Sequence, residues 1–185
     1  IYTPLFVGSV DVYKRQNLTN SKKLAAELFH AERRHINTDS DSEVLLNIFA
    51  LELSKQEAVF PKPKDFFTAV EKTHLRINGA YAVVALVTGY GILAFRDPLG
   101  IRPLSIGIRK GKNRNEYVVS SETALFSSTG FKFLRDVEPG EAVFIDNAGK
   151  IFSQQCATSP QKRPCIFEYV YPVSYTHLTL PTNSG

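Results

Sequence analysis

The chain has 185 residues, of which 43% are hydrophobic and 22% charged, as in an ordinary globular domain large enough to bury a core. Its 22 basic and 18 acidic residues are spread along the sequence and leave a net charge of +4, so we expect no nucleic-acid partner. No apolar run has the length of a membrane span, and we expect no membrane partner.

The two ends of the sequence differ from the part between them. Residues 11–16 (Asp-Val-Tyr-Lys-Arg-Gln) and 173–183 resemble translated adaptor or vector sequence, which is excluded from fold reasoning. We therefore expect a non-native leader over residues 1–16, a domain over 17–171 and a non-native tail over 172–185. The alternative is a genuine apolar arm and tail.

Helical patterns fill the first part of the domain. A helix is expected from about residue 21 through Arg33, with Asn20 or Ser21 as its N-cap. Ser40-Asp-Ser-Glu43 has the spacing of a capping box and precedes apolar residues with helical periodicity, which predicts a second helix. A third helix is expected over residues 65–77.

Extended patterns follow. Strands are expected over residues 80–88, 92–95, 104–108, 116–121, 131–137, 142–145 and 150–154, with a short helix over 123–128. Helices followed by antiparallel strands indicate an α+β fold and not alternating βαβ units.

Charged residues stand in the turn that follows the second expected strand. Arg96, Asp97 and Arg102 would be costly at the end of a buried strand unless they were paired. We interpret them as a structural ion cluster that holds the connection between strands. The alternative is that they shape the wall of an active site.

The same turn carries a family resemblance. Arg96-Asp-Pro-x-Gly-x-Arg-Pro-Leu104, after Gly79-Ala-Tyr-Ala82, resembles the glutaminase domain of the class II glutamine amidotransferases. Three further strings point to the branch of that family that uses phosphoribosyl pyrophosphate: Asn17-Leu-Thr-Asn20, the run over residues 33–43, and Phe167-Glu-Tyr-Val-Tyr171. The resemblance extends from about Asn17 to Tyr171.

The resemblance implies a fold and an activity. The fold would be an N-terminal-nucleophile hydrolase type four-layer sandwich (α/β/β/α), incomplete here at its N-terminal side. The parent enzyme would be cytoplasmic and homo-oligomeric, and would hydrolyse glutamine to supply ammonia for 5-phosphoribosylamine, the first committed step of purine synthesis. Phosphoribosyl pyrophosphate and Mg²⁺ would bind in a further domain after residue 171.

The family's catalytic groups have no counterpart in this sequence. Its nucleophile is an N-terminal cysteine whose α-amine is the base, because an α-amine can take up a thiol proton near neutral pH. This sequence begins with Ile1, and Cys156 and Cys165 both have amide nitrogens. Arg15-Gln16 stand where the family has the Asn-Gly pair of the oxyanion hole. We therefore name no catalytic residue and expect no glutaminase activity.

One substrate-binding residue is implied. Asp41 matches the aspartate that receives the α-ammonium group of glutamine, a role suited to a carboxylate in a partly dry pocket. The alternative is that Asp41 only complements a helix dipole. Asp39 stands on the variable side of the motif, and we expect it to be exposed to solvent.

Other assignments stay open. In some relatives a cysteine at the position of Cys165 binds an iron–sulfur cluster, but the default interpretation is a buried structural thiol, since no metal-binding spacing is present. Another class II amidotransferase, of the glucosamine-phosphate synthase or asparagine synthetase type, is the nearest alternative family member. A non-catalytic binding module is the alternative from a different functional class.

Overall fold

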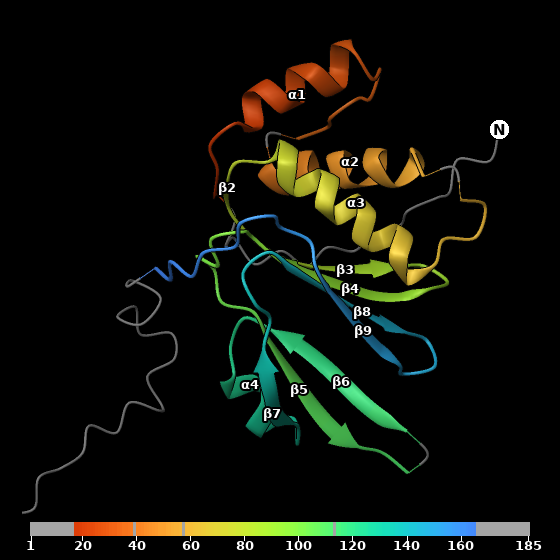
Figure 1. Ribbon diagram of the computed structural model, residues 1–185, viewed down its shortest axis with the longest axis vertical. Coiled ribbons are helices and arrows are strands. Elements are labelled where there is room, and N and C mark those ends of the chain that lie inside the picture. The colour runs from red at the N-terminus through yellow and green to blue at the C-terminus, as the bar shows by residue number, and fades with distance from the viewer. Residues whose placement is uncertain (1–16, 39, 57, 113, 166–185) are drawn as a thin grey trace, which may run out of the picture.

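The computed structural model describes residues 17–38, 40–56, 58–112 and 114–165. Along the chain (Figure 1) lie β1 (Asn17–Leu18), α1 (Ser21–His30), α2 (Asp41–Ser54), α3 (Pro63–Arg76), β2 (Gly79–Ala80), β3 (Ala82–Val87), β4 (Gly91–Arg96), β5 (Ser105–Lys110), β6 (Asn115–Ser120), α4 (Ala124–Ser128), β7 (Lys132–Asp136), β8 (Glu141–Asp146) and β9 (Ile151–Gln155). The three long helices therefore precede every strand except β1, and only the short α4 lies among the later strands, which confirms the predicted α+β class. The predicted strands are present, with ends that differ by one or two residues.

The strands form three antiparallel sheets. The larger two have the orders β3-β4-β8-β9 and β6-β5-β7, and β1 pairs with β2. In Figure 1, α2 and α3 lie on one side of the first sheet and the β6-β5-β7 sheet lies on the other. A buried cluster that includes Phe66, Phe95 and Phe144 joins the helices to the first sheet. A second cluster, with Ile106 and Val143 among its members, lies between the two sheets.

Two helix ends differ from the prediction. The first helix stops at His30 and not at Arg33, because Arg33 adopts a left-handed backbone (φ 52°) and the N–H of Arg34 bonds back to the carbonyl of Leu28 at 2.9 Å. The third helix begins earlier than predicted, at Pro63. Proline suits the first helical position, and Asp65 Oδ2 accepts the N–H of Lys62 at 2.8 Å.

Arg76, at the end of α3, connects all three long helices. Its guanidinium donates to Glu27 of α1 at 2.5 Å and to Glu52 of α2 at 2.7 Å. Because the Glu52 side chain is only 8% exposed, we expect Arg76→Met to lower the free energy of unfolding by about 2 kcal/mol in urea titrations. Arg109→Met removes the exposed ion pair with Glu116 and should cost about 1 kcal/mol or less. Equal losses would contradict this account.

Candidate functional site

The first turn of α2 lies against the start of the described chain. Asp41 is the first residue of that helix and is half-buried. Its Oδ2 accepts the backbone N–H of Leu18 in β1 at 2.9 Å, although the two residues are 23 positions apart. The helix therefore presents this carboxylate to the backbone of β1, at the first described residues.

The loop before Asp41 is held by the helix itself. Ser40 is the N-cap, and its Oγ accepts the N–H of Ser42 at 3.3 Å. Glu43 accepts from the backbone N–H groups of Asn37 and Thr38 at 2.7 and 2.8 Å, and from the Thr38 hydroxyl at 2.6 Å. These bonds, led by the one from Asn37, lower the pKa of Glu43. The predicted capping box is thus wrong in detail, because Glu43 binds an earlier part of the loop and not the Ser40 N–H.

Asn20 holds β1 in place. Its amide donates to the carbonyl of Arg76 at 2.8 Å and accepts the N–H of Asn78 at 3.0 Å. The N–H of Thr19 also donates to the carbonyl of Asn78, at 2.9 Å. Gly79 allows the close approach, since its φ is 140° and a Cβ there would lie 2.2 Å from the carbonyl oxygen of Asn17. Asn20 therefore clamps β1 onto β2 and makes no side-chain cap for α1.

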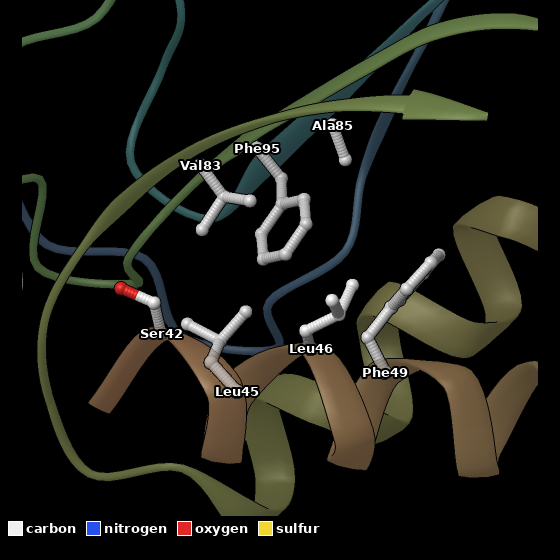
Figure 2. A pocket seen from close by; sticks show the side chains of 7 residues that line it. All are labelled: Ser42, Leu45, Leu46, Phe49, Val83, Ala85 and Phe95. Carbon is white, nitrogen blue, oxygen red and sulfur yellow. The ribbon is translucent and has the colours of Figure 1, made fainter. Parts of the chain in front are cut away.

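A small apolar pocket lies between α2 and the first sheet. Its cavity volume is about 10 Å³, which is about the space of one water molecule. Figure 2 shows side chains of α2 directed towards those of β3 and β4; the lining residues are Ser42, Leu45, Leu46, Phe49, Val83, Ala85 and Phe95. Ser42 directly follows Asp41 in α2.

Arg96 and Asp97 hold the turn after β4 by binding its backbone. Asp97 is fully buried and accepts the N–H groups of Leu99 at 2.9 Å and Ile101 at 3.1 Å. The guanidinium of Arg96 donates to the carbonyls of Arg102, Gly100 and Val137 at 2.5, 2.7 and 2.8 Å, in that order. The sequence suggested that these side chains form an ion cluster with Arg102. In the structure, Arg96 and Asp97 bind backbone groups, including those of Arg102.

A buried histidine and tyrosine lie next to that turn. His74 Nδ1 is 2.7 Å from the hydroxyl of Tyr81, and both side chains are buried. Burial lowers the pKa of His74 to about 4, and the Gly140 backbone opposes this shift. Burial, together with the nearby Asp97, raises the pKa of Tyr81. The pair is therefore neutral at physiological pH.

The two cysteines differ in burial. Cys156 is 4% exposed, with its Sγ 3.5 Å from the carbonyl of Phe67, and burial raises its pKa to about 12. Cys165 is half-buried, and not buried as the sequence predicted. Within the described ranges no three His, Cys, Asp or Glu side chains lie close enough to hold a metal ion.

Comparison with known proteins decides the family. A family model described as a glutamine amidotransferase domain matches residues 4–128. The chain belongs to this family. It is 48% identical over 171 residues to amidophosphoribosyltransferase of Pasteurella multocida and 49% identical over 172 residues to that of Escherichia coli. Each match covers 91% of this chain and 34% of the relative, so the chain spans about a third of the length of these relatives.

Solved structures agree with this assignment. The glutamine phosphoribosylpyrophosphate amidotransferase from B. subtilis, complexed with ADP and GMP, superposes with a TM-score of 0.67 at 31% identity and covers 84% of this chain and 31% of its own. A structure described as the allosteric regulatory enzyme of purine biosynthesis gives the same TM-score and identity. The resemblance predicted from the motifs is confirmed.

Asp41, Arg96, Asp97 and Arg102 all lie among the described residues. Ser42, which follows Asp41, lines the same pocket as Phe95, the residue before Arg96. The expected leader, the expected tail, Asp39 and the Phe167–Tyr171 string lie outside the described residues. No helix in the described part is long and apolar enough to cross a membrane.

Proposed function

We propose that this chain forms the wall of a glutaminase site that binds the α-ammonium group of glutamine, in an amidophosphoribosyltransferase. The observation that carries the proposal is the half-buried Asp41 carboxylate on the first turn of α2, bonded to the N–H of Leu18. A carboxylate offers about four acceptor positions, so the bond to Leu18 leaves capacity for an ammonium group.

The geometry suits this role for an electrostatic reason. Asp41 is half-buried, and the next residue, Ser42, lines an apolar pocket, so a charge pair at Asp41 is weakened less by solvent than at an open surface. The Glu43 bonds to the preceding loop and the Asn20 clamp on β1 fix the two segments that meet at Asp41. The site is therefore held in place before the ligand arrives, which limits the entropy lost on binding.

The reaction of the whole enzyme follows from the relatives. Ammonia released from glutamine would be used with phosphoribosyl pyrophosphate to make 5-phosphoribosylamine in the cytoplasm. Phosphoribosyl pyrophosphate and Mg²⁺ would be bound in the part of the relatives that this chain does not span. The nucleotides in the B. subtilis structure suggest that purine nucleotides regulate the parent enzyme, which we expect to be a homo-oligomer.

We assign the fold to the N-terminal-nucleophile hydrolase type, a four-layer α/β/β/α sandwich. Two buried clusters support this assignment, one between the helices and the β3-β4-β8-β9 sheet and one between the two larger sheets. The short helix α4 contributes the buried Phe126, which lies near Gly107 of β5 and supports the last layer.

Binding of glutamine tests the proposal. We expect Asp41→Asn to weaken the binding of glutamine, followed by NMR titration, by about tenfold or more because the charge-assisted bond is lost. Asp39→Asn, the same change two positions earlier, is the control and should leave binding unchanged. Glutaramate, which lacks the α-amine, should bind no better to the wild-type chain than to Asp41→Asn. Equal glutamine affinity in all three proteins would overturn the assignment of Asp41.

The 185-residue chain is expected to release no glutamate from glutamine. The backbone nitrogens of Cys156 and Cys165 are amides, so neither can serve as the base that takes up a thiol proton. Burial also keeps the Cys156 thiol protonated at neutral pH. A coupled glutamate dehydrogenase assay on purified chain measures this, with the Cys156→Ser and Cys165→Ser double variant as the blank. Glutamate release above that blank would contradict the expectation.

A further inference from the structure

The short strand β1 carries one of the bonds of the proposed site. The N–H of Leu18 in β1 donates to Asp41 Oδ2 at 2.9 Å. The strand pairs with β2 over only two residues on each side, and so short an antiparallel pair is marginal on its own. The place of the Leu18 N–H therefore depends on what else holds β1.

The side chain of Asn20 supplies that hold. Its amide nitrogen donates to the carbonyl of Arg76 at 2.8 Å, and its amide oxygen accepts the N–H of Asn78 at 3.0 Å. A side-chain amide offers a donor and an acceptor in one planar group. An aspartate at this position could still accept from Asn78, but it would turn a second acceptor towards the Arg76 carbonyl. The two bonds therefore require an amide.

These contacts form a closed ring that includes Asp41. From Asp41 the helix α2 leads to Glu52, whose carboxylate accepts from the guanidinium of Arg76 at 2.7 Å. The carbonyl of Arg76 accepts the Asn20 amide, and two residues before Asn20 the N–H of Leu18 donates to Asp41. The Glu52 and Arg76 side chains are 8% and 18% exposed, so solvent screens their pairing less than at an open surface. The ring thus refers the carboxylate at the start of α2 to a shielded ion pair near the end of the same helix.

We propose that Asn20 is a positioning residue for the binding of an α-amino acid. Through β1 it fixes the Leu18 N–H, and through that N–H the orientation of the Asp41 carboxylate. An aspartate side chain has several staggered rotamers, and the bond from Leu18 selects one of them. In the described part of the chain this bond engages Oδ2 alone, so Oδ1 stays available for an ammonium group. This role rests on the proposed function, because Asn20 acts through the same Asp41 carboxylate.

Ligands with and without the α-ammonium group separate positioning from folding. We expect Asn20→Ala to weaken the binding of glutamine, followed by NMR titration, by about fivefold or more, because the Asp41 carboxylate loses its fixed orientation. The affinity for glutaramate should not change, whereas a general loss of structure would weaken the binding of both ligands. Thr19→Val is the matched control. It removes the exposed hydroxyl bond to the Asn78 carbonyl at 3.2 Å and should bind glutamine as the wild type does.

A double-mutant cycle shows whether Asn20 acts through Asp41. In an Asp41→Asn background, Asn20→Ala should have no further effect on the affinity for glutamine. Additive losses would overturn this role of Asn20, as would equal weakening of both ligands by Asn20→Ala or unchanged glutamine binding in that variant. If Asp41→Asn alone leaves glutamine binding unchanged, the proposed function fails, and the role of Asn20 fails with it.

Amide hydrogen exchange tests the structural step without a ligand. In Asn20→Ala, the protection of the Leu18 amide should fall at least about tenfold further than that of Ile48, a fully buried residue of α2 that reports on global opening. In Thr19→Val the two amides should keep their wild-type protection. An equal fall at Leu18 and Ile48 in Asn20→Ala would show that Asn20 contributes only to overall stability, and would overturn its positioning role.

Discussion

Replacing Asp97 by alanine is expected to lower the free energy of unfolding by about 3 to 4 kcal/mol. The carboxylate is fully buried and accepts backbone N–H groups of Leu99 and Ile101, with longer contacts of 3.4 Å to those of Tyr81 and Arg102. Alanine leaves these donors without an acceptor in a buried turn. Urea titration of the two proteins measures the loss.

Asp146→Ala is the matched control for this prediction. Asp146 also accepts a backbone N–H, that of Lys150 at 2.8 Å, but in the exposed turn between β8 and β9. Water can replace that bond, so we expect a loss of about 1 kcal/mol. If the two variants lose the same stability, the turn after β4 does not depend on its buried carboxylate.

Lowering the pH from 6.5 to 4 is expected to destabilise the protein through His74. Burial lowers the pKa of this imidazole from 6.5 to about 4 in the folded chain, so the unfolded chain binds more protons between these values. Stability is therefore full above pH 6.5 and falls as the pH is lowered towards 4. The difference between the two pKa values corresponds to about 3 kcal/mol.

The His74 contribution can be separated from that of the carboxylates. His74→Gln removes the titrating group, and we expect the pH dependence of its unfolding free energy to be flatter than that of the wild type by about the same 3 kcal/mol. His30→Gln, at an exposed position at the end of α1, should behave as the wild type does. The neighbouring Tyr81 and Asp97 are present in all three proteins. The prediction fails if His74→Gln and His30→Gln give the same profile.

The elements that depend on local pattern could be predicted from the sequence. Alternating and continuous apolar runs gave the strands, and Ser40 gave the start of α2, because these signals come from neighbouring residues. The end of α1 and the partners of Glu43 and Asn20 could not be predicted in this way. Asn20 bonds to Asn78, 58 positions away, and no local spacing records such a contact.

In the candidate site, too, local signals could be predicted from the sequence and long-range contacts could not. Asp41 could be found only through its family motif, since spacing alone favours a helix-dipole role. The bond from Leu18 that places its carboxylate beside β1 is long-range. For Arg96 and Asp97, the sequence predicted buried charges that need partners, but not that backbone groups would be those partners.

The carboxyl carbon of Asp41 reports most directly on whether this chain binds the α-ammonium group of glutamine. Carbon-13 NMR of the wild-type chain should show this resonance and the Leu18 amide shifting saturably as glutamine is added, with no such shift for glutaramate. Unchanged Asp41 and Leu18 resonances at saturating glutamine, or identical shifts with glutaramate, would contradict the account.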